Sequence, residues 1–140
     1  MSFLLDTCVV SELRKPERRA DSRVRGWAKA QPLHALYLSV ITVLEIEIGV
    51  ARAERRDTWQ GKRLRDWLNQ QVLAAFNRRI LPVDLAVARR TAALHIPDPR
   101  PERDALIAAT ALEHGLTVAT RNEVDFTPMG ADVINPWRSP

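Results

Sequence analysis

Four carboxylates in this 140-residue chain stand where a catalytic or metal site could form. Asp6 interrupts an apolar run over residues 3–10, and a buried carboxylate needs a partner because desolvating an isolated charge is costly. Glu45 and Asp125 each follow a predicted strand, so their side chains could point with Asp6 into one crevice beyond the carboxyl ends of parallel strands. Asp104 lies in the first turn of a predicted helix, and the sequence does not say which end of the sheet that turn reaches.

Such a cluster predicts a bound cation. Four neighbouring carboxylates cannot all stay ionised without one. The three histidines and the single cysteine show no metal-ligand spacing, and hard oxygen ligands suit Mg²⁺ or Mn²⁺. Two such ions about 3.5–4 Å apart activate water and stabilise the leaving oxygen in phosphodiester cleavage. A formal net charge of +4 is compatible with nucleic acid as a partner.

Each acid also has an ordinary structural interpretation. Asp6 could be the N-cap of the following helix. Thr42 and Glu45 have the S/T-x-x-E spacing of a capping box, which would use Glu45 on a backbone N–H. Asp104 could complement a helix dipole, and Asp125 could be a turn residue.

Strand-like and helix-like segments alternate along the chain. The predicted strands are 2–5, 36–40, 80–83, 116–120 and 132–134. The predicted helices are 7–14, 21–30, 42–55, 58–77, 85–94 and 101–114, and residues 121–126 are predicted to form a turn. This alternation predicts an α/β fold with a central parallel sheet of four to five short strands flanked by helices. The length predicts a single domain over residues 1–140.

Turn and cap residues set several of these boundaries. Pro16 ends the first helix, because the residue before a proline avoids helical geometry. Asp84 is placed to cap the helix that follows it. The segment 97–101 holds three prolines and predicts a loop, with Pro101 at the first position of the next helix and Gly115 as that helix's stop.

Four segments, in order, resemble a PIN-domain protein. They read FLLDTCVVSEL (3–13), SVITVLEIEIGV (39–50), ERDALIAATALEHGLTVATRNEVDF (102–126) and VINPW (133–137). The likeness is greatest to VapC or FitB-type toxins of bacterial type II toxin–antitoxin pairs. It covers nearly the whole chain, and residues 58–79 match least.

This resemblance implies an endoribonuclease that needs Mg²⁺ or Mn²⁺. The acidic quartet of the family maps onto Asp6, Glu45, Asp104 and Asp125, which we predict to be both catalytic and metal-binding. Asp6 and Asp104 would be the main metal ligands, and Glu45 and Asp125 would complete the site or hold metal-bound waters. Cleavage by water would leave a 5′-phosphate and a 3′-hydroxyl.

The resemblance also assigns four positions beside the acids to substrate binding. Thr7 matches the family's small hydroxyl residue after the first acid. Thr120 matches its polar position at a strand end, and Asn122 lies in the matching "TRN" turn. Arg121 lies between these two and is the single basic residue that we favour for contact with RNA phosphates.

The family further implies partners. We expect a cognate VapB-like antitoxin, an RNA substrate, a homodimer and a heterotetramer with two antitoxins. The apolar faces of the helices at 39–53 and 58–77 could form these interfaces, or they could belong to the core. The chain shows no signal peptide and no apolar run of membrane-spanning length, and its lone Cys8 excludes an internal disulfide, so we expect a cytoplasmic protein.

Other residues with chemical potential keep two interpretations. The basic stretch could be a solvated helix face or a phosphate track beside the site; it comprises Arg14, Lys15, Arg18, Arg19, Arg23, Arg25 and Lys29. The four tryptophans favour core or interface roles over base stacking.

Other functions also stay open. The acids could form a non-catalytic module that holds a metal or a partner's arginine, and DNA could be the substrate in place of RNA. A phosphotransfer enzyme with Asp6 as nucleophile is disfavoured, because that class needs a second acid two residues on, where Cys8 stands.

Overall fold

Five short strands lie side by side, all parallel, in the computed structural model, which describes residues 1–138. Their order is β3-β2-β1-β4-β5. The strands are β1 (Phe3–Leu5), β2 (Leu36–Ser39), β3 (Ile80–Leu81), β4 (Thr117–Ala119) and β5 (Val133–Ile134). Phe3 of the central strand pairs with Leu36 on one side and with Thr117 on the other. The predicted parallel sheet is confirmed, and each strand is shorter than predicted.

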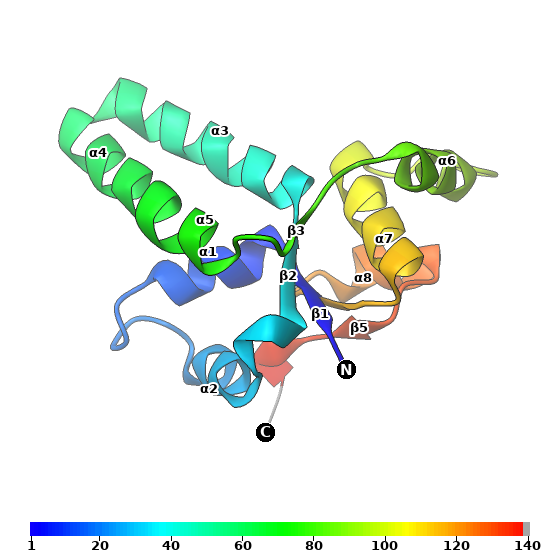
Figure 1. Ribbon diagram of the computed structural model, residues 1–140, viewed down its shortest axis with the longest axis horizontal. Helices are drawn as coiled ribbons and strands as arrows, with labels where there is room; N and C mark the ends of the chain where they lie inside the picture. Colours follow the sequence, from blue (N-terminus) through cyan, green and yellow to red (C-terminus); the bar gives the residue numbers. More distant parts are fainter. Residues whose placement is uncertain (139–140) are drawn as a thin grey trace.

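Helices cover both faces of this sheet (Figure 1). They are α1 (Thr7–Arg14), α2 (Ser22–Ala30), α3 (Val40–Arg56), α4 (Thr58–Trp67), α5 (Leu73–Ala75), α6 (Leu85–Leu94), α7 (Glu102–His114) and α8 (Glu123–Phe126). Helices α1 to α5 gather on one side of the strands in Figure 1, and α6 to α8 on the other.

The core therefore has two layers, one on each face of the sheet. Along β1, Phe3 and Leu5 pack into the layer with α1 and α2, whereas Leu4 packs into the layer with α7. All three are buried, as expected for a strand covered on both faces. Trp27 meets the Phe3 ring edge to face at 5.0 Å and is a core residue, as predicted. Trp59, by contrast, is 71% exposed and is not part of the core.

The predicted ends of two helices are confirmed, and the start of a third is corrected. The Asp84 carboxylate accepts from an N–H group at the start of α6, as predicted. Asp21, predicted as the first residue of its helix, is instead the N-cap of α2, and its carboxylate accepts from N–H groups of the first turn. Gly115 ends α7 with φ at +65°, a left-handed conformation that costs glycine no steric strain. Pro101 is the N-cap of α7, one position before its predicted place.

Helix α3 begins two residues earlier than predicted. Ser39 is its N-cap, and the serine hydroxyl accepts from the N–H of Ile41 at 3.0 Å. Thr42 is therefore already inside the helix, and the predicted capping box with Glu45 is wrong. The physical reason is that β2 ends at a serine, whose hydroxyl caps the helix without a linker.

Two further segments differ from expectation. The helix predicted over 58–77 is interrupted by a π-helical turn at Leu68–Val72, which buries Leu68 and Val72. Residues 121–126 were predicted as a turn, yet they contain α8, because Phe126 is buried against the α7 layer.

Helices α3 and α4 pack closely along their length. Gly61 makes this approach possible, because a side-chain carbon there would collide with the backbone of Glu54. No helix within residues 1–138 combines the length and apolarity needed to cross a bilayer. Residues 139–140 of the predicted domain lie outside the described part of the chain.

Candidate active site

The strand order reverses at β1, and this reversal creates the candidate site. The carboxyl ends of β1 and β4 are neighbours, since the N–H of Asp6 donates to the carbonyl of Ala119 at 2.9 Å. Open parallel sheets bind ligands beyond the carboxyl ends of their strands at such a point. Asp6 directly follows β1 and Thr120 directly follows β4, so both lie at this opening.

The Asp6 carboxylate is buried and fixed at both oxygens. Its Oδ1 accepts from the N–H of Thr7 at 2.8 Å, which caps α1. Its Oδ2 accepts from the hydroxyl of Thr120 at 2.7 Å. The residue is only 5% exposed. The predicted N-cap role is thus confirmed, and the second oxygen adds a bond that capping does not explain.

Glu45 is held at the same place by α1 and α7. Its Oε1 accepts from the hydroxyl of Thr7 at 2.6 Å, and its Oε2 lies 3.9 Å from the Arg103 guanidinium. A capping glutamate would have bonded its own helix N-terminus instead. Three elements that are distant in sequence therefore converge on one carboxylate.

Asp104 joins the cluster electrostatically. Burial is the largest cause that raises the pKa of its carboxyl, followed by the negative charges of Asp6, Asp125 and Glu45, and together they bring it to about 6. Asp104 is therefore near enough to the other three acids to be affected by their charge. The structure thus brings all four predicted acids into one electrostatic environment, although they come from residues 6 to 125 of the chain.

These acids form a cluster of negative charge, not a closed cage. Within residues 1–138, no three aspartate, glutamate, histidine or cysteine side chains converge tightly enough to make a ready-formed metal site. The donors present are carboxylate oxygens, which suit a hard divalent cation. The chemistry of the donor set therefore fits Mg²⁺ or Mn²⁺, and the cation would have to draw the acids together.

Cys8 lies beside the cluster without changing this conclusion. Its sulfur is 3.7 Å from Oδ2 of Asp6 and 3.7 Å from the hydroxyl of Thr120. Burial raises the pKa of the Cys8 thiol, and the Asp6 charge raises it further. The thiol therefore stays protonated at neutral pH, which disfavours it as a nucleophile and as a soft metal ligand.

The four predicted substrate-binding positions divide into two pairs. The Thr7 hydroxyl donates to Glu45, and the Thr120 hydroxyl donates to Asp6. Thr120 is fully buried. Arg121 is exposed, with its guanidinium 4.3 Å from the centre of the Trp137 ring. Asn122 is also exposed, and its N–H donates to the Thr120 hydroxyl at 2.9 Å. A substrate role for all four stays a prediction.

Comparison with known proteins places the fold and the cluster in a family. A sequence model described as "PIN domain" matches residues 3–127. The chain belongs to the PIN-domain family. In this PIN domain, the four acids all fall within the matched region.

The relatives that match over nearly their full length include one named as a ribonuclease and one named as a toxin. The chain is 41% identical to "VapC ribonuclease Y4jK" of Sinorhizobium fredii, covering 96% of this chain and 97% of that protein. It is 40% identical to "Toxin FitB" of Neisseria gonorrhoeae, covering 96% and 98%. Among solved structures, FitAcB from Neisseria gonorrhoeae superposes with a TM-score of 0.88 at 38% identity, covering 97% of this chain and 99% of that one. The VapC/FitB resemblance is confirmed.

The sequence did not single out one charged residue of this PIN domain. Arg103 precedes Asp104 in the first turn of α7, and its guanidinium approaches Glu45. The available signal was a cation directly beside a predicted acid in a helical turn. It is the only ion-pair partner found for the quartet within residues 1–138.

Proposed function

We propose that this chain is an Mg²⁺- or Mn²⁺-dependent endoribonuclease that acts as the toxin of a type II toxin–antitoxin pair. The observation that carries the proposal is the pair of carboxylates held at the opening of the sheet, Asp6 by the Thr120 hydroxyl and Glu45 by the Thr7 hydroxyl. The raised pKa of Asp104 agrees with this gathering of acids. Clustered carboxylates with a single, distant cation beside them are suited to a divalent cation. Relatives named as a VapC ribonuclease and as a FitB toxin, each matched over nearly their full length, support the same assignment.

Asp6 and Asp104 would hold the cation, with Glu45 and Asp125 completing its surroundings. A divalent ion bound there would neutralise phosphate charge and make water a better nucleophile. The chain's own contribution is orientation. Thr120 fixes one oxygen of Asp6 at 2.7 Å, and the Thr7 hydroxyl fixes one oxygen of Glu45 at 2.6 Å. Such supporting bonds hold ligands in place before the substrate arrives.

On the substrate side, the exposed Arg121 and Asn122 would contact RNA phosphates. The guanidinium of Arg121 rests on the Trp137 ring, which limits the conformations it samples. Hydrolysis would leave a 5′-phosphate and a 3′-hydroxyl.

The test is cleavage by partner-free protein. Wild type, Asp6→Asn and the control Asp98→Asn, which alters an exposed acid of the proline loop, are incubated with a pool of structured RNAs and with DNA of matching sequence. Each reaction contains Mg²⁺, Mn²⁺ or EDTA. We expect defined RNA cuts with extendable 3′-hydroxyl ends from wild type and Asp98→Asn with metal. RNA cleavage by Asp6→Asn at the wild-type rate would contradict the proposal. Cleavage of DNA but not of RNA would show that the substrate is DNA.

One observation favours a second candidate, a non-catalytic module whose acids accept a partner's arginine. Glu45 already lies 3.9 Å from a guanidinium of its own chain, so the cluster can receive one. This module would bind its partner with no RNA turnover. The cleavage test above separates the two functions.

We also propose an antitoxin partner, of the VapB kind, that covers the acidic site. A solved structure described as a toxin–antitoxin complex from Klebsiella pneumoniae supports this, with a TM-score of 0.69 and 28% identity. Pairing with such a protein in the cytoplasm, where RNA is available, would keep the nuclease silent.

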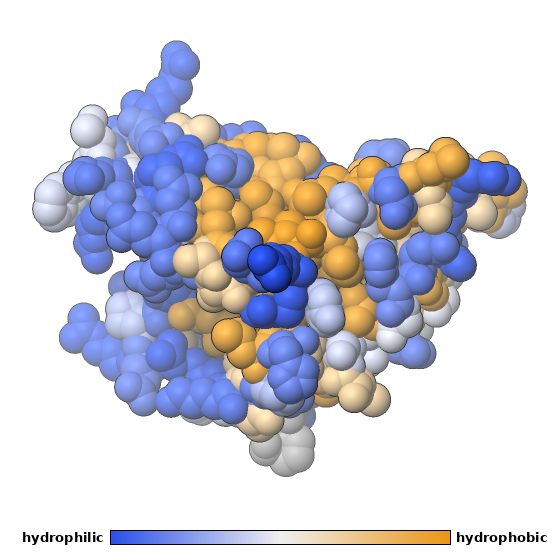
Figure 2. Space-filling model, viewed as in Figure 1, coloured by the Kyte–Doolittle hydropathy of each residue, from blue (hydrophilic) through white to orange (hydrophobic). Residues whose placement is uncertain are grey.

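A homodimer completes the proposed assembly. Figure 2 shows apolar side chains gathered over the region between α3 and α7, where the edge strand β3 lies. Leu44 of α3 is 45% exposed, and Leu85 of α6 is 74% exposed. Large exposed apolar patches mark interaction surfaces. We expect wild type to be dimeric and Leu44→Glu to be monomeric by light scattering, and equal masses would contradict this interface.

A further inference from the structure

A groove between α1 and α4 leads away from the acidic site. Its inner section, of about 210 Å³, is lined by Thr7, Glu45, Arg14 and Trp67 among others. Its outer section, of about 580 Å³, shares Arg14 and Trp67 and continues to Arg19 and Arg63. The two sections therefore form one path from the Glu45 carboxylate to the protein surface.

The arginines along this path have no acidic partner. Arg14, Arg19 and Arg63 are exposed, and none of them forms an ion pair within residues 1–138. Asp66, the acid of the outer section, pairs with Lys62 at 3.4 Å instead. The groove is therefore positively charged, beside a site that is negatively charged.

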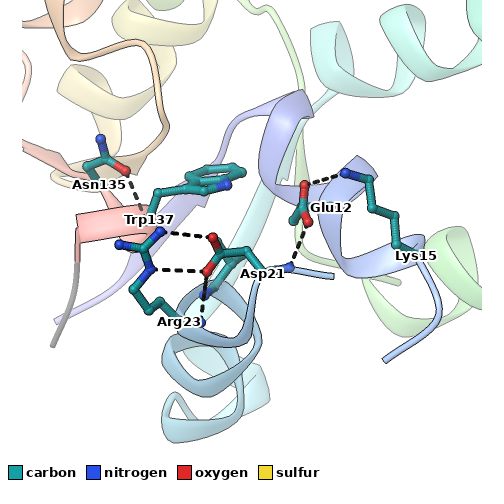
Figure 3. A network of polar contacts seen from close by, with 7 residues as sticks. Glu12, Lys15, Asp21, Arg23, Asn135 and Trp137 are labelled. Atoms are coloured by element: carbon teal, nitrogen blue, oxygen red, sulfur yellow. Dashed lines mark hydrogen bonds and ion pairs between the residues drawn. The ribbon is translucent and has the colours of Figure 1, made fainter. Parts of the chain in front are cut away.

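Several other basic residues of the stretch 14–29 make ion pairs or hydrogen bonds within the protein. Figure 3 shows Lys15 paired with Glu12, at 2.9 Å, and Arg23 paired with Asp21, at 3.0 Å. Arg25 donates to the backbone oxygen of Lys15 at 3.2 Å. The basic stretch is thus not one continuous track. Of the basic stretch, Arg14 and Arg19 line the groove. Arg63, which lies far away in sequence, lines it as well.

The remaining lining suits a nucleic acid chain. Trp67 is partly exposed, and the Arg14 guanidinium lies 5.9 Å from the centre of its ring. Gln60 and Gln70 add amide groups on the same face of the π-interrupted helix. Arginine neutralises phosphates, and aromatic faces stack with bases of any sequence.

We propose that this groove binds the phosphate backbone of single-stranded RNA through Arg14, Arg19 and Arg63, and directs the strand to the acidic site. The inference rests on the proposed ribonuclease function and adds the route of its substrate. Charge complementarity and continuity with the acids carry it. A partner protein is the competing occupant.

The test measures RNA binding in the cleavage-deficient Asp104→Asn background, so that the RNA stays intact. The probe is a fluorescein-labelled 12-nucleotide single-stranded RNA of mixed sequence, followed by anisotropy at several salt concentrations. Arg14→Gln/Arg19→Gln/Arg63→Gln is compared with the control Arg89→Gln, which removes an exposed arginine of α6 on the other side of the sheet. Circular dichroism and melting curves check that each variant folds.

We expect the triple variant to bind at least about tenfold more weakly, and its log–log salt dependence to flatten by about 2, because single strands contribute about 0.7 per phosphate contact. Arg89→Gln should match its parent. Unchanged affinity and salt slope in the triple variant would overturn the proposed RNA route. If wild type still cleaves RNA in the cleavage assay, the proposed ribonuclease function would stand. If RNA affinity is unchanged but the antitoxin no longer co-purifies with the triple variant, the groove binds a partner protein, and the RNA route is overturned. Wild type that neither binds nor cleaves RNA would overturn the route and the proposed function together.

Discussion

Two groups of carboxylates in this protein are treated in opposite ways. Between α3 and α4, Glu47 and Glu54 of the first helix both bond Arg65 of the second, at 2.7 Å and 3.1 Å. At the end of the sheet, four acids share one environment, with only the distant contact of Arg103 to Glu45 at 3.9 Å. The fold thus gives the first pair of acids a close cation, whereas Glu45 is the one member of the second group with a guanidinium nearby within residues 1–138.

The pKa values express the same difference. The hydrogen bond from Arg65 lowers the pKa of Glu54, so that carboxylate is stable in its charged form. Burial and neighbouring acids raise the pKa of Asp104 to about 6, so its charged form is disfavoured until a cation arrives. A group shifted in this direction within a cluster of acids is typical of a functional site.

Removing a carboxylate from the cluster should have the largest effect. Asp104→Asn keeps the side-chain volume and removes a proposed metal ligand, so we expect RNA cleavage to fall by about 100-fold or more. Gel assays at saturating Mg²⁺ measure this rate. The paired acid Glu54→Gln is the matched control, and a similar loss there would erase the distinction between the two groups.

Next in size is the loss of support for Asp6. Thr120→Val removes the 2.7 Å bond to Oδ2 with little change of volume. Because second-layer partners orient metal ligands, we expect a loss of about 10-fold to 100-fold in cleavage. A buried acceptor left unpaired should also lower the free energy of unfolding by about 1–3 kcal/mol in the metal-free protein. Full activity in Thr120→Val would show that Asp6 needs no such support.

The paired group should respond only in stability. Arg65→Met keeps most of the stem and removes all three hydrogen bonds, one to Glu47 and two to Glu54. These side chains are partly exposed, so we expect only a small drop in the midpoint of urea unfolding. Cleavage should stay at the wild-type rate. A drop in cleavage without a drop in stability would mean that this ion pair on α4 influences the acidic site.

The smallest effect is a pH dependence of opposite sign in the two groups. Asp104 binds its proton more tightly when folded, with a pKa of about 6 against 3.8, so its contribution is fully present below about pH 4 and is lost as pH rises through about 6. Glu54 has a lowered pKa, so its contribution is present above 4.5 and is lost as pH falls.

Melting curves from pH 4 to 8 without metal test this sign. Above pH 6, Asp104→Asn should be more stable than wild type by about 1 kcal/mol, a value reduced for the solvent access of the side chain. Added Mg²⁺ should remove that advantage. A variant that is less stable than wild type at every pH would contradict the repulsion within the cluster.

Much of this arrangement follows from local sequence signals. Asp84 begins a helix and Gly115 ends one, as predicted, because caps act on the nearest backbone groups. The alternation of strands and helices predicts the sheet, and the parallel order places Asp6 beside Thr120.

The sequence failed where the outcome depends on tertiary contacts. Thr42 and Glu45 have the spacing of a capping box, yet Ser39 caps the helix. The Glu45 carboxylate accepts from the Thr7 hydroxyl instead. Arg63 had no local signal, and the only signal of Arg103 was its place beside Asp104. Their positions near the site arise from packing of α4 on α3 and of α7 on the sheet, which no local pattern encodes.

The acids at the end of the sheet should bind a divalent cation, and the acids paired with Arg65 should not. The direct measurement is Mn²⁺ binding, followed by the electron paramagnetic resonance signal of free Mn²⁺ at pH 7. We predict that wild type and Glu54→Gln bind Mn²⁺ equally, and that Asp104→Asn binds it at least about tenfold more weakly. Equal Mn²⁺ binding by all three proteins, or none by wild type, would contradict the account.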